Sequence, residues 1–145
     1  MATTTYSFDD VSCVISHPSK GQYVTNGKGL GGISISMSTD RSAHDLSADG
    51  SVMVSKIRGR NGIASITVQQ TSSLHKWFLK LYNYLEAASA SEWAELKIII
   101  RSPMMEDLVT CSGVSFQKIP DKPYQAQGQN ISWPLMAADI QHDAL

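Results

Sequence analysis

The chain has 145 residues, of which 42% are hydrophobic and 17% charged, and its formal net charge is −1 at pH 7. This length and composition predict one folded domain, and the apolar fraction is enough for a core, so the chain need not be disordered. The near-zero charge argues against a general binder of polyanions, and it gives little repulsion against self-association.

Alternation of apolar and polar residues in the first half of the chain is typical of strands with one buried face. The expected strands cover residues 6–16, 33–38, 51–57 and 63–70. Inward-facing side chains in the last three are expected to be Ile33, Ile35, Met37, Val52, Val54, Ile66 and Val68. A polar loop at 39–50 and a tight turn at 58–62 connect these three strands, which predicts an antiparallel meander.

The glycines of residues 27–32 spell a dinucleotide-binding fingerprint, Gly27-x-Gly29-x-x-Gly32. That fingerprint needs a strand before it and a helix N-terminus after it, because the helix end holds the pyrophosphate. A strand follows here, so we expect a flexible lead-in without a nucleotide site.

The spacing of apolar residues changes after residue 70 from a period of two to a period of 3.6 residues, which predicts a helix over about residues 72–88. Its apolar stripe is formed by Leu74, Trp77, Phe78, Leu81 and Leu85. Thr71-Ser72-Ser73 supplies the N-cap. Further strands are expected at 95–100, 108–118 and 128–140. The sum is a single, mainly β domain over residues 1–145, an antiparallel β-sandwich or small barrel with one packed helix.

The expected protomer core combines two strands and this helix. Its members are Ile33, Ile35, Ile66, Val68, Leu74, Trp77, Phe78, Leu81 and Leu85.

Residues that could carry catalysis or hold a metal are sparse. The four histidines, which we expect to be exposed, lack a second histidine or cysteine at zinc-ligand spacing; they are His17, His44, His75 and His142. There is no Gly-x-Ser-x-Gly elbow. We therefore predict no enzyme activity, no cofactor and no metal.

Two cysteines, Cys13 and Cys111, exclude a disulfide framework. Buried reduced thiols are the favoured interpretation, and one long-range bridge is the alternative. The first ten residues lack the basic and apolar regions of a secretion signal, which predicts synthesis in the cytosol.

Charged residues gather around the expected loop and turn. The basic ones are Arg41, Lys56, Arg58 and Arg60, and the acidic ones Asp40, Asp45 and Asp49. One interpretation is that water solvates these charges, and the other is that they pair with charges of a partner subunit. The sequence leaves both open.

Four short stretches, taken in this order, resemble the tail tube proteins of contractile-tailed bacteriophages. They are residues 6–16 beginning Tyr6-Ser-Phe-Asp-Asp, Ser47-Ala-Asp-Gly-Ser-Val52, Ile66-Thr-Val-Gln-Gln-Thr-Ser72, and the closing Ile131-Ser-Trp-Pro-Leu with Ala138-Asp-Ile140. The resemblance implies a β protomer that closes into hexameric rings, and rings that stack head to tail around a DNA channel. It places the loop at 39–50 against the adjacent ring.

The resemblance also implies contacts, partners and a location. The expected inter-ring or inter-subunit contacts are Asp40, Arg41, His44, Asp45, Asp49, Lys56, Arg58 and Arg60. The implied partners are other copies of the chain, the tail sheath protein, the tape measure, baseplate and tail terminator proteins, and genomic DNA in transit. The implied location is the virion tail, assembled in the cytoplasm of the host bacterium.

Two other functions stay open. The same fold would serve as the inner tube of a contractile secretion or bacteriocin-like injection device, and the sequence does not separate this device from a phage tail. A small β-domain enzyme or ligand-binding module would need a pocket with converging polar groups.

Overall fold

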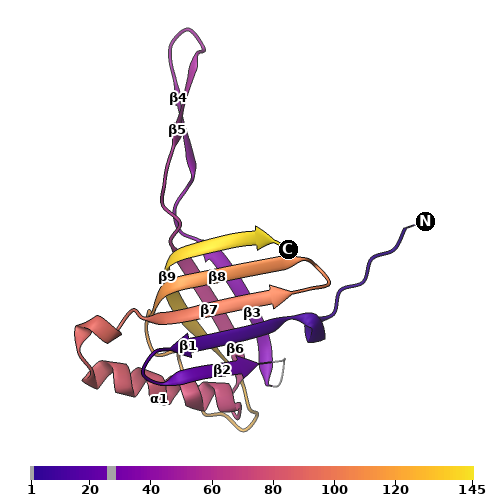
Figure 1. The fold of residues 1–145 in the computed structure, drawn as a ribbon, viewed down its shortest axis with the longest axis vertical. Helices are drawn as coiled ribbons and strands as arrows, with labels where there is room; N and C mark the ends of the chain where they lie inside the picture. Colours follow the sequence, from indigo (N-terminus) through magenta and orange to yellow (C-terminus); the bar gives the residue numbers. More distant parts are fainter. Residues whose placement is uncertain (1, 26–28) are drawn as a thin grey trace.

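The computed structural model describes residues 2–25 and 29–145, and about half of it consists of antiparallel strands (Figure 1). The strands are β1 (Ser12–His17), β2 (Gly21–Thr25), β3 (Leu30–Met37), β4 (Ser42–Leu46), β5 (Val52–Lys56), β6 (Gly62–Gln69), β7 (Leu96–Ser102), β8 (Asp107–Phe116) and β9 (Asn130–Ala144). The helix α1 spans Ser73–Ala87, and short 3-10 helices lie at Phe8–Asp10 and Ala90–Glu92.

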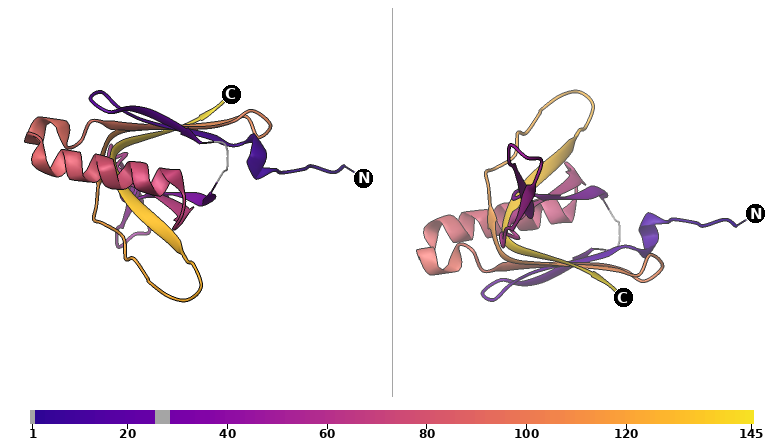
Figure 2. Two further views of the ribbon diagram at one scale, coloured as in Figure 1. Left: turned by 90° about the horizontal axis from the view of Figure 1, so that it is seen from below. Right: turned by 90° about the horizontal axis from the view of Figure 1, so that it is seen from above.

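Seven strands form one antiparallel sheet in the order β2-β1-β7-β8-β9-β6-β3. Strand β9 has 15 residues. It pairs with β6 through residues 130–137 and with β8 through residues 135–144. Because the two ladders overlap only at its middle, the sheet bends across β9 into two layers. Figure 2 shows the β1–β2–β7–β8 layer nearly edge-on, with the first half of β9 leaving it at an angle.

The core lies between these layers and is closed by α1. The Leu74 N–H donates to the Ser72 hydroxyl at 3.1 Å, which caps the first turn of the helix. The ring of Phe78 packs against Trp133 with 5.3 Å between centroids. Fully buried members of the expected core are Ile66, Val68, Leu74, Phe78, Leu81 and Leu85. Its half-buried members, which pack against that cluster, are Ile33, Ile35 and Trp77.

The mainly β fold with one helix, expected from the sequence, is confirmed, but the sheet is open rather than a closed barrel. Within the described residues its two edges are β2 and β3. Strand β2 was not predicted from the sequence, and the predicted strand over residues 6–16 includes residues 8–10, where a 3-10 helix lies. Residues 27 and 28 of the expected glycine-rich lead-in lie outside the described residues, and Leu30 already begins β3.

The predicted meander through residues 51–57 is wrong. Strand β3 pairs directly with β6, Ile33 opposite Ile66, and β5 pairs with β4 in a separate two-stranded sheet. Val52 and Val54, expected to face the core, are 50% and 62% exposed. Met37 is also exposed, at 39%. Alternation identifies an apolar strand face, but it does not identify what covers that face.

Two histidines expected at the surface are buried, and both have hydrogen-bond partners. The Nδ1 atom of His75 accepts from the Trp133 indole N–H at 3.1 Å. The Nδ1 atom of His17 accepts from the Ser19 N–H at 3.1 Å, and its Nε2 lies 3.1 Å from the Glu92 carbonyl. Both rings are therefore structural groups of the protomer.

The cysteines are free and buried, on strands that flank β7. Cys13 lies opposite Ile100 and Cys111 opposite Ile98. Burial raises the pKa of Cys13 to about 12 and that of Cys111 to about 11. Because both cysteines are free, the alternative of a long-range disulfide is not realised. The raised pKa values keep both thiols protonated at neutral pH.

We expect Phe78→Ala to lower the free energy of unfolding by about 3–5 kcal/mol, because it leaves a cavity beside Trp133 and Phe116. Urea denaturation followed by tryptophan fluorescence measures this loss. Trp77→Ala is the matched control and should cost less, since Trp77 is only partly buried. Equal costs for the two variants would contradict the described core.

The pKa of His75 is lowered, first by burial of its ring and then by the charge of Lys122. As pH falls, the unfolded chain therefore takes up this proton before the folded chain does, so stability is full above about pH 6.5 and falls below it. We expect denaturation midpoints to fall between pH 7 and pH 5, and to fall less in His75→Gln, whose amide oxygen can still accept from Trp133. Identical pH dependence in both proteins would contradict this prediction.

Candidate assembly surface

A two-stranded hairpin formed by β4 and β5 projects from one end of the protein (Figure 1). Its turn is built by Asp49 and Gly50, where Gly50 has φ +91. The Asp49 carboxylate accepts hydrogen bonds from the Ser47 hydroxyl and from the Ser51 N–H, the latter at 3.0 Å. These bonds lower the pKa of Asp49 to about 2. The tip is therefore an ordered turn that is negatively charged at neutral pH.

The distal part of one hairpin face is apolar and lies in water, and Ser42 and Lys56 continue this face toward the base. Leu46 pairs with Val52, and Val54 pairs with His44, so these side chains share one face. Leu46 is 71% exposed. The other face carries the pairs Ala43 with Ser55 and Asp45 with Met53. Isolated two-stranded hairpins are marginally stable in water, and exposed apolar faces mark interaction surfaces. The hairpin is therefore the strongest candidate for a contact surface.

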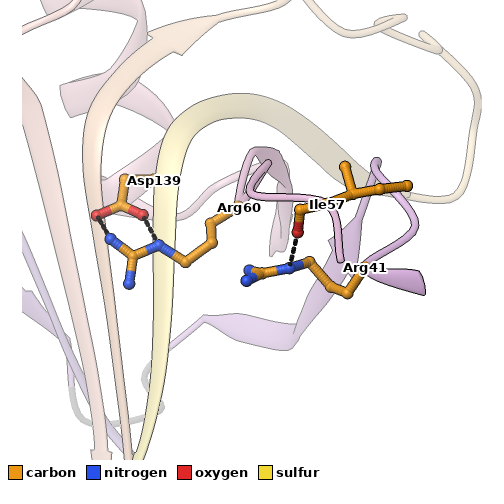
Figure 3. A network of polar contacts seen from close by, with 4 residues as sticks. All are labelled: Arg41, Ile57, Arg60 and Asp139. Carbon is orange, nitrogen blue, oxygen red and sulfur yellow. Dashed lines mark hydrogen bonds and ion pairs between the residues drawn. The ribbon is translucent and has the colours of Figure 1, made fainter. Parts of the chain in front are cut away.

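The base of the hairpin is anchored to the sheet. The Arg60 guanidinium holds the Asp139 carboxylate on β9 through Nε–Oδ1 at 2.8 Å and a second hydrogen bond at 3.1 Å. The Arg41 Nε donates to the Ile57 carbonyl at 2.7 Å (Figure 3). The Thr39 hydroxyl donates to the Asn61 side-chain oxygen at 2.6 Å. These contacts orient the hairpin relative to β9.

Gly62 returns the chain from the hairpin to the sheet at a point where no side chain fits. A Cβ atom there would lie 2.3 Å from the Ser36 carbonyl oxygen and 2.8 Å from Ile140 Cδ1. Close backbone approach is therefore the structural reason for glycine at this position.

All eight residues expected at inter-subunit contacts lie on the hairpin or at its base, and all are exposed. Their charges are partly separated along it. Asp45 and Asp49 lie toward the tip, whereas Asp40 and the basic residues lie at or near the base, the basic ones being Arg41, Lys56, Arg58 and Arg60. Asp49, Arg41 and Arg60 also make the contacts within the protomer described above.

A second candidate surface is the outer face of β3, β6 and the first half of β9. Its cross-strand rows combine Ser34 with Ser65 and Pro134, Gly32 with Thr67 and Ser132, and Ser36 with Ile63 and Met136. The Thr67 and Ser132 hydroxyls are 2.8 Å apart and hydrogen-bonded. None of the residues in these rows is charged. The sequence showed only the serines of β3, because the rows depend on pairing between distant strands.

A model of the family described as bacteriophage PhiTE tail tube protein matches residues 1–144 of the chain. The chain belongs to this tail tube family. The resemblance to phage tail tube proteins that the sequence suggested is thereby confirmed. The family consists of structural tail proteins. None of the curated proteins matches this chain significantly.

Solved structures similar to this tail tube family member come from the anti-feeding prophage and from PVC, an extracellular contractile injection system. The tube terminating cap of the anti-feeding prophage shares 9% identity at a TM-score of 0.58, covering 100% of this chain and 94% of that one. A chain of the anti-feeding prophage baseplate shares 12% identity at a TM-score of 0.57, covering 99% of this chain and 98% of that one. A chain of the PVC sheath–tube complex in its extended state shares 9% identity at a TM-score of 0.55, covering 92% of this chain and 88% of that one. At these identities the likeness shows the fold.

Within residues 2–25 and 29–145, no group of three or more His, Cys, Asp or Glu side chains is placed to hold a metal ion. No helix in the same part of this tail tube family member is long and apolar enough to cross a membrane.

We expect Gly62→Ala to lower the free energy of unfolding by about 1–3 kcal/mol, because the added methyl group overlaps the backbone of β3. Thermal unfolding followed by circular dichroism measures the loss. Gly128→Ala is the matched control, since a Cβ atom there meets nothing within 4 Å. A wild-type melting curve for Gly62→Ala would contradict the close approach at the base of the hairpin.

Proposed function

We propose that this tail tube family member closes into hexameric rings, and that the rings stack head to tail into the inner tube of a contractile tail. DNA passes through the lumen of this tube during ejection into the host. The observation that carries the proposal is the β4–β5 hairpin, whose apolar face a single protomer leaves exposed. Contact with a neighbouring subunit removes that face from water.

The hairpin and its base supply the proposed contacts between subunits. These contact residues are Asp40, Arg41, His44, Asp45, Asp49, Lys56, Arg58 and Arg60. Both signs of charge occur in this set, so it suits contact with a neighbouring copy that presents opposite charges to it. The region about residues 39–50, which contains β4, is the proposed inter-ring segment.

The uncharged outer face of β3, β6 and β9 is the proposed wall of the lumen. Lysine and arginine on such a wall would bind the phosphate backbone and slow its passage. Hydroxyl groups such as those of Ser34, Ser65 and Thr67 keep a wall wet without holding a polyanion. In the described part of the chain the β2 and β3 edges are open, and pairing them between neighbours would join the protomers into a ring.

The proposed partners follow from this role. The similar solved structures are those of a sheath–tube complex, a baseplate and a sheath/tube terminator. By analogy the tube contacts the tail sheath protein, the baseplate and the tail terminator, and it encloses the tape measure protein and the genomic DNA. Its place is the virion tail, assembled in the cytoplasm of the host.

A tube of a contractile injection device that delivers protein is the second candidate. It is favoured by the fold shared with the anti-feeding prophage and with PVC, an extracellular contractile injection system. Purified particles from the producing strain distinguish the two. DNA-filled heads joined to the tails support the phage tail, and headless particles carrying protein support the injection device.

Negative-stain electron microscopy over a concentration series tests the assembly itself. We expect six-fold rings or hollow tubes, forming more readily as the protein concentration rises. Featureless protomers at every concentration, with or without purified baseplate as a nucleus, would contradict the proposed function.

We expect Val54→Ser to shift ring and tube formation to higher protein concentration while leaving the melting temperature of the protomer unchanged, since Val54 is 62% exposed. Met53→Ser is the matched control, because Met53 is 61% exposed and lies on the opposite face of the hairpin. Sedimentation followed by microscopy measures assembly. Equal effects of the two substitutions would rule out the apolar face as the contact.

A further inference from the structure

The end of the protein opposite the hairpin carries the loop of residues 117–129. Strands β3 and β6 each have eight residues, which corresponds to about 25 Å. The hairpin lies beyond Met37 and Gly62, whereas the loop enters the sheet at Asn130, which pairs with Gln69 at the far end of β6. Figure 1 shows the hairpin and this loop at opposite ends of the long axis.

The loop is held in one shape by a single side chain at its mouth. The Gln70 Nε2 donates to the Pro123 carbonyl at 2.6 Å, and the Gln70 Oε1 accepts from the Gln129 N–H at 3.0 Å. The backbone N–H of Gln70 also donates to the Gln129 carbonyl at 3.2 Å. Pro120 is buried. A loop ordered in this way binds a partner without a large cost in conformational entropy.

The surface of the loop is apolar and weakly basic. Tyr124 is 88% exposed and Ile119 is 39% exposed. A hollow of about 430 Å³ beside Lys118 and Pro123 is also lined by Ser65, Ser132 and Pro134, so it lies at the border between the loop and the outer β6–β9 face. The charged residues of the loop are Lys118, Asp121 and Lys122, which sum to +1. The distal part of the hairpin, residues 44–54, carries Asp45 and Asp49 and sums to −2.

Head-to-tail stacking requires two different, complementary surfaces at opposite ends of one subunit. The hairpin and the loop satisfy this requirement in position, in exposed apolar area and in charge. Resting on the proposed stacking of rings, we propose that loop 117–129 of one copy receives the tip of the β4–β5 hairpin from a copy in the adjacent ring. The occupant of this loop surface is thus a second copy of the chain.

Site-specific cross-linking in assembled tubes tests this contact. The test variant carries Ala48→Cys at the hairpin tip and Tyr124→Cys on the loop, and the control carries Ala48→Cys with Asn83→Cys on α1, all three positions being exposed. The native thiols of Cys13 and Cys111 are not expected to react with a maleimide, because both are buried. With a short bis-maleimide, we expect most of the test protein, and little of the control, to migrate as a ladder of covalent oligomers.

The outcomes separate the two levels of the proposal. Tubes without a tip-to-loop cross-link, or with an equally strong cross-link in the control, would overturn the loop as receiver and leave the tube function standing. Failure of the wild-type protein to assemble would overturn the tube function and the contact together.

A second variant guards against cysteine substitutions that disturb assembly. Ile119→Ser together with Tyr124→Ser is expected to preserve single rings, with at least a tenfold loss of tube length in micrographs. Met105→Ser in the β7–β8 turn, which is 44% exposed, is its control. Tubes of wild-type length from the double variant would overturn the proposed contact.

Discussion

Strand β9 has to complete two sheet layers at once, and the rest of the structure depends on this constraint. Its residue Leu135 lies between Ala64 on β6 and Phe116 on β8, so it belongs to both ladders. Two residues earlier, Trp133 is fully buried against Phe78 of α1. The β6–β9 ladder also sets where the hairpin and the loop 117–129 leave the sheet. Core packing and the placement of both candidate contact surfaces therefore share one ladder.

Local periodicity was sufficient to predict the helix and most strands, because each of them buries a face against the core. It failed at β5, where Val52 alternates like a core residue but lies on a projecting hairpin. It failed again at His75, which is buried because Trp133, 58 positions away, needs a hydrogen-bond acceptor. The rows of hydroxyl groups on the outer β3–β6–β9 face could not be predicted from local periodicity, since they exist only after these three strands pair. Each miss concerns a partner distant in sequence or absent from the chain.

The formal charge of −1 conceals a separation of charge along the molecule. Asp45 and Asp49 lie toward the hairpin tip, the basic groups and Asp40 lie at its base, and the rows of the outer β3–β6–β9 face carry no charge. The distal hairpin sums to −2 and the loop 117–129 at the other end of the protein sums to +1. These opposite charges favour one direction of stacking over its reverse, because the reverse brings like charges together. An uncharged wall between these ends is consistent with passage of a polyanion. Distribution, rather than total charge, is therefore the informative quantity.

A protomer of this shape is poorly suited to exist alone. In residues 2–25 and 29–145, the edges of β2 and β3 are open and present backbone groups that are ready templates for pairing with another chain. The hairpin adds an apolar face that the protomer does not cover. Natural monomeric β proteins protect such edges with charges, prolines or bulges. The pairing of β3 with β6 has a register shift between Leu30 and Gly32, but beyond it the outward positions of β3 carry only glycine and serine. Closure into a ring would pair the edges, and stacking would cover the hairpin. Features that are liabilities in a monomer thus become the contacts of an assembly.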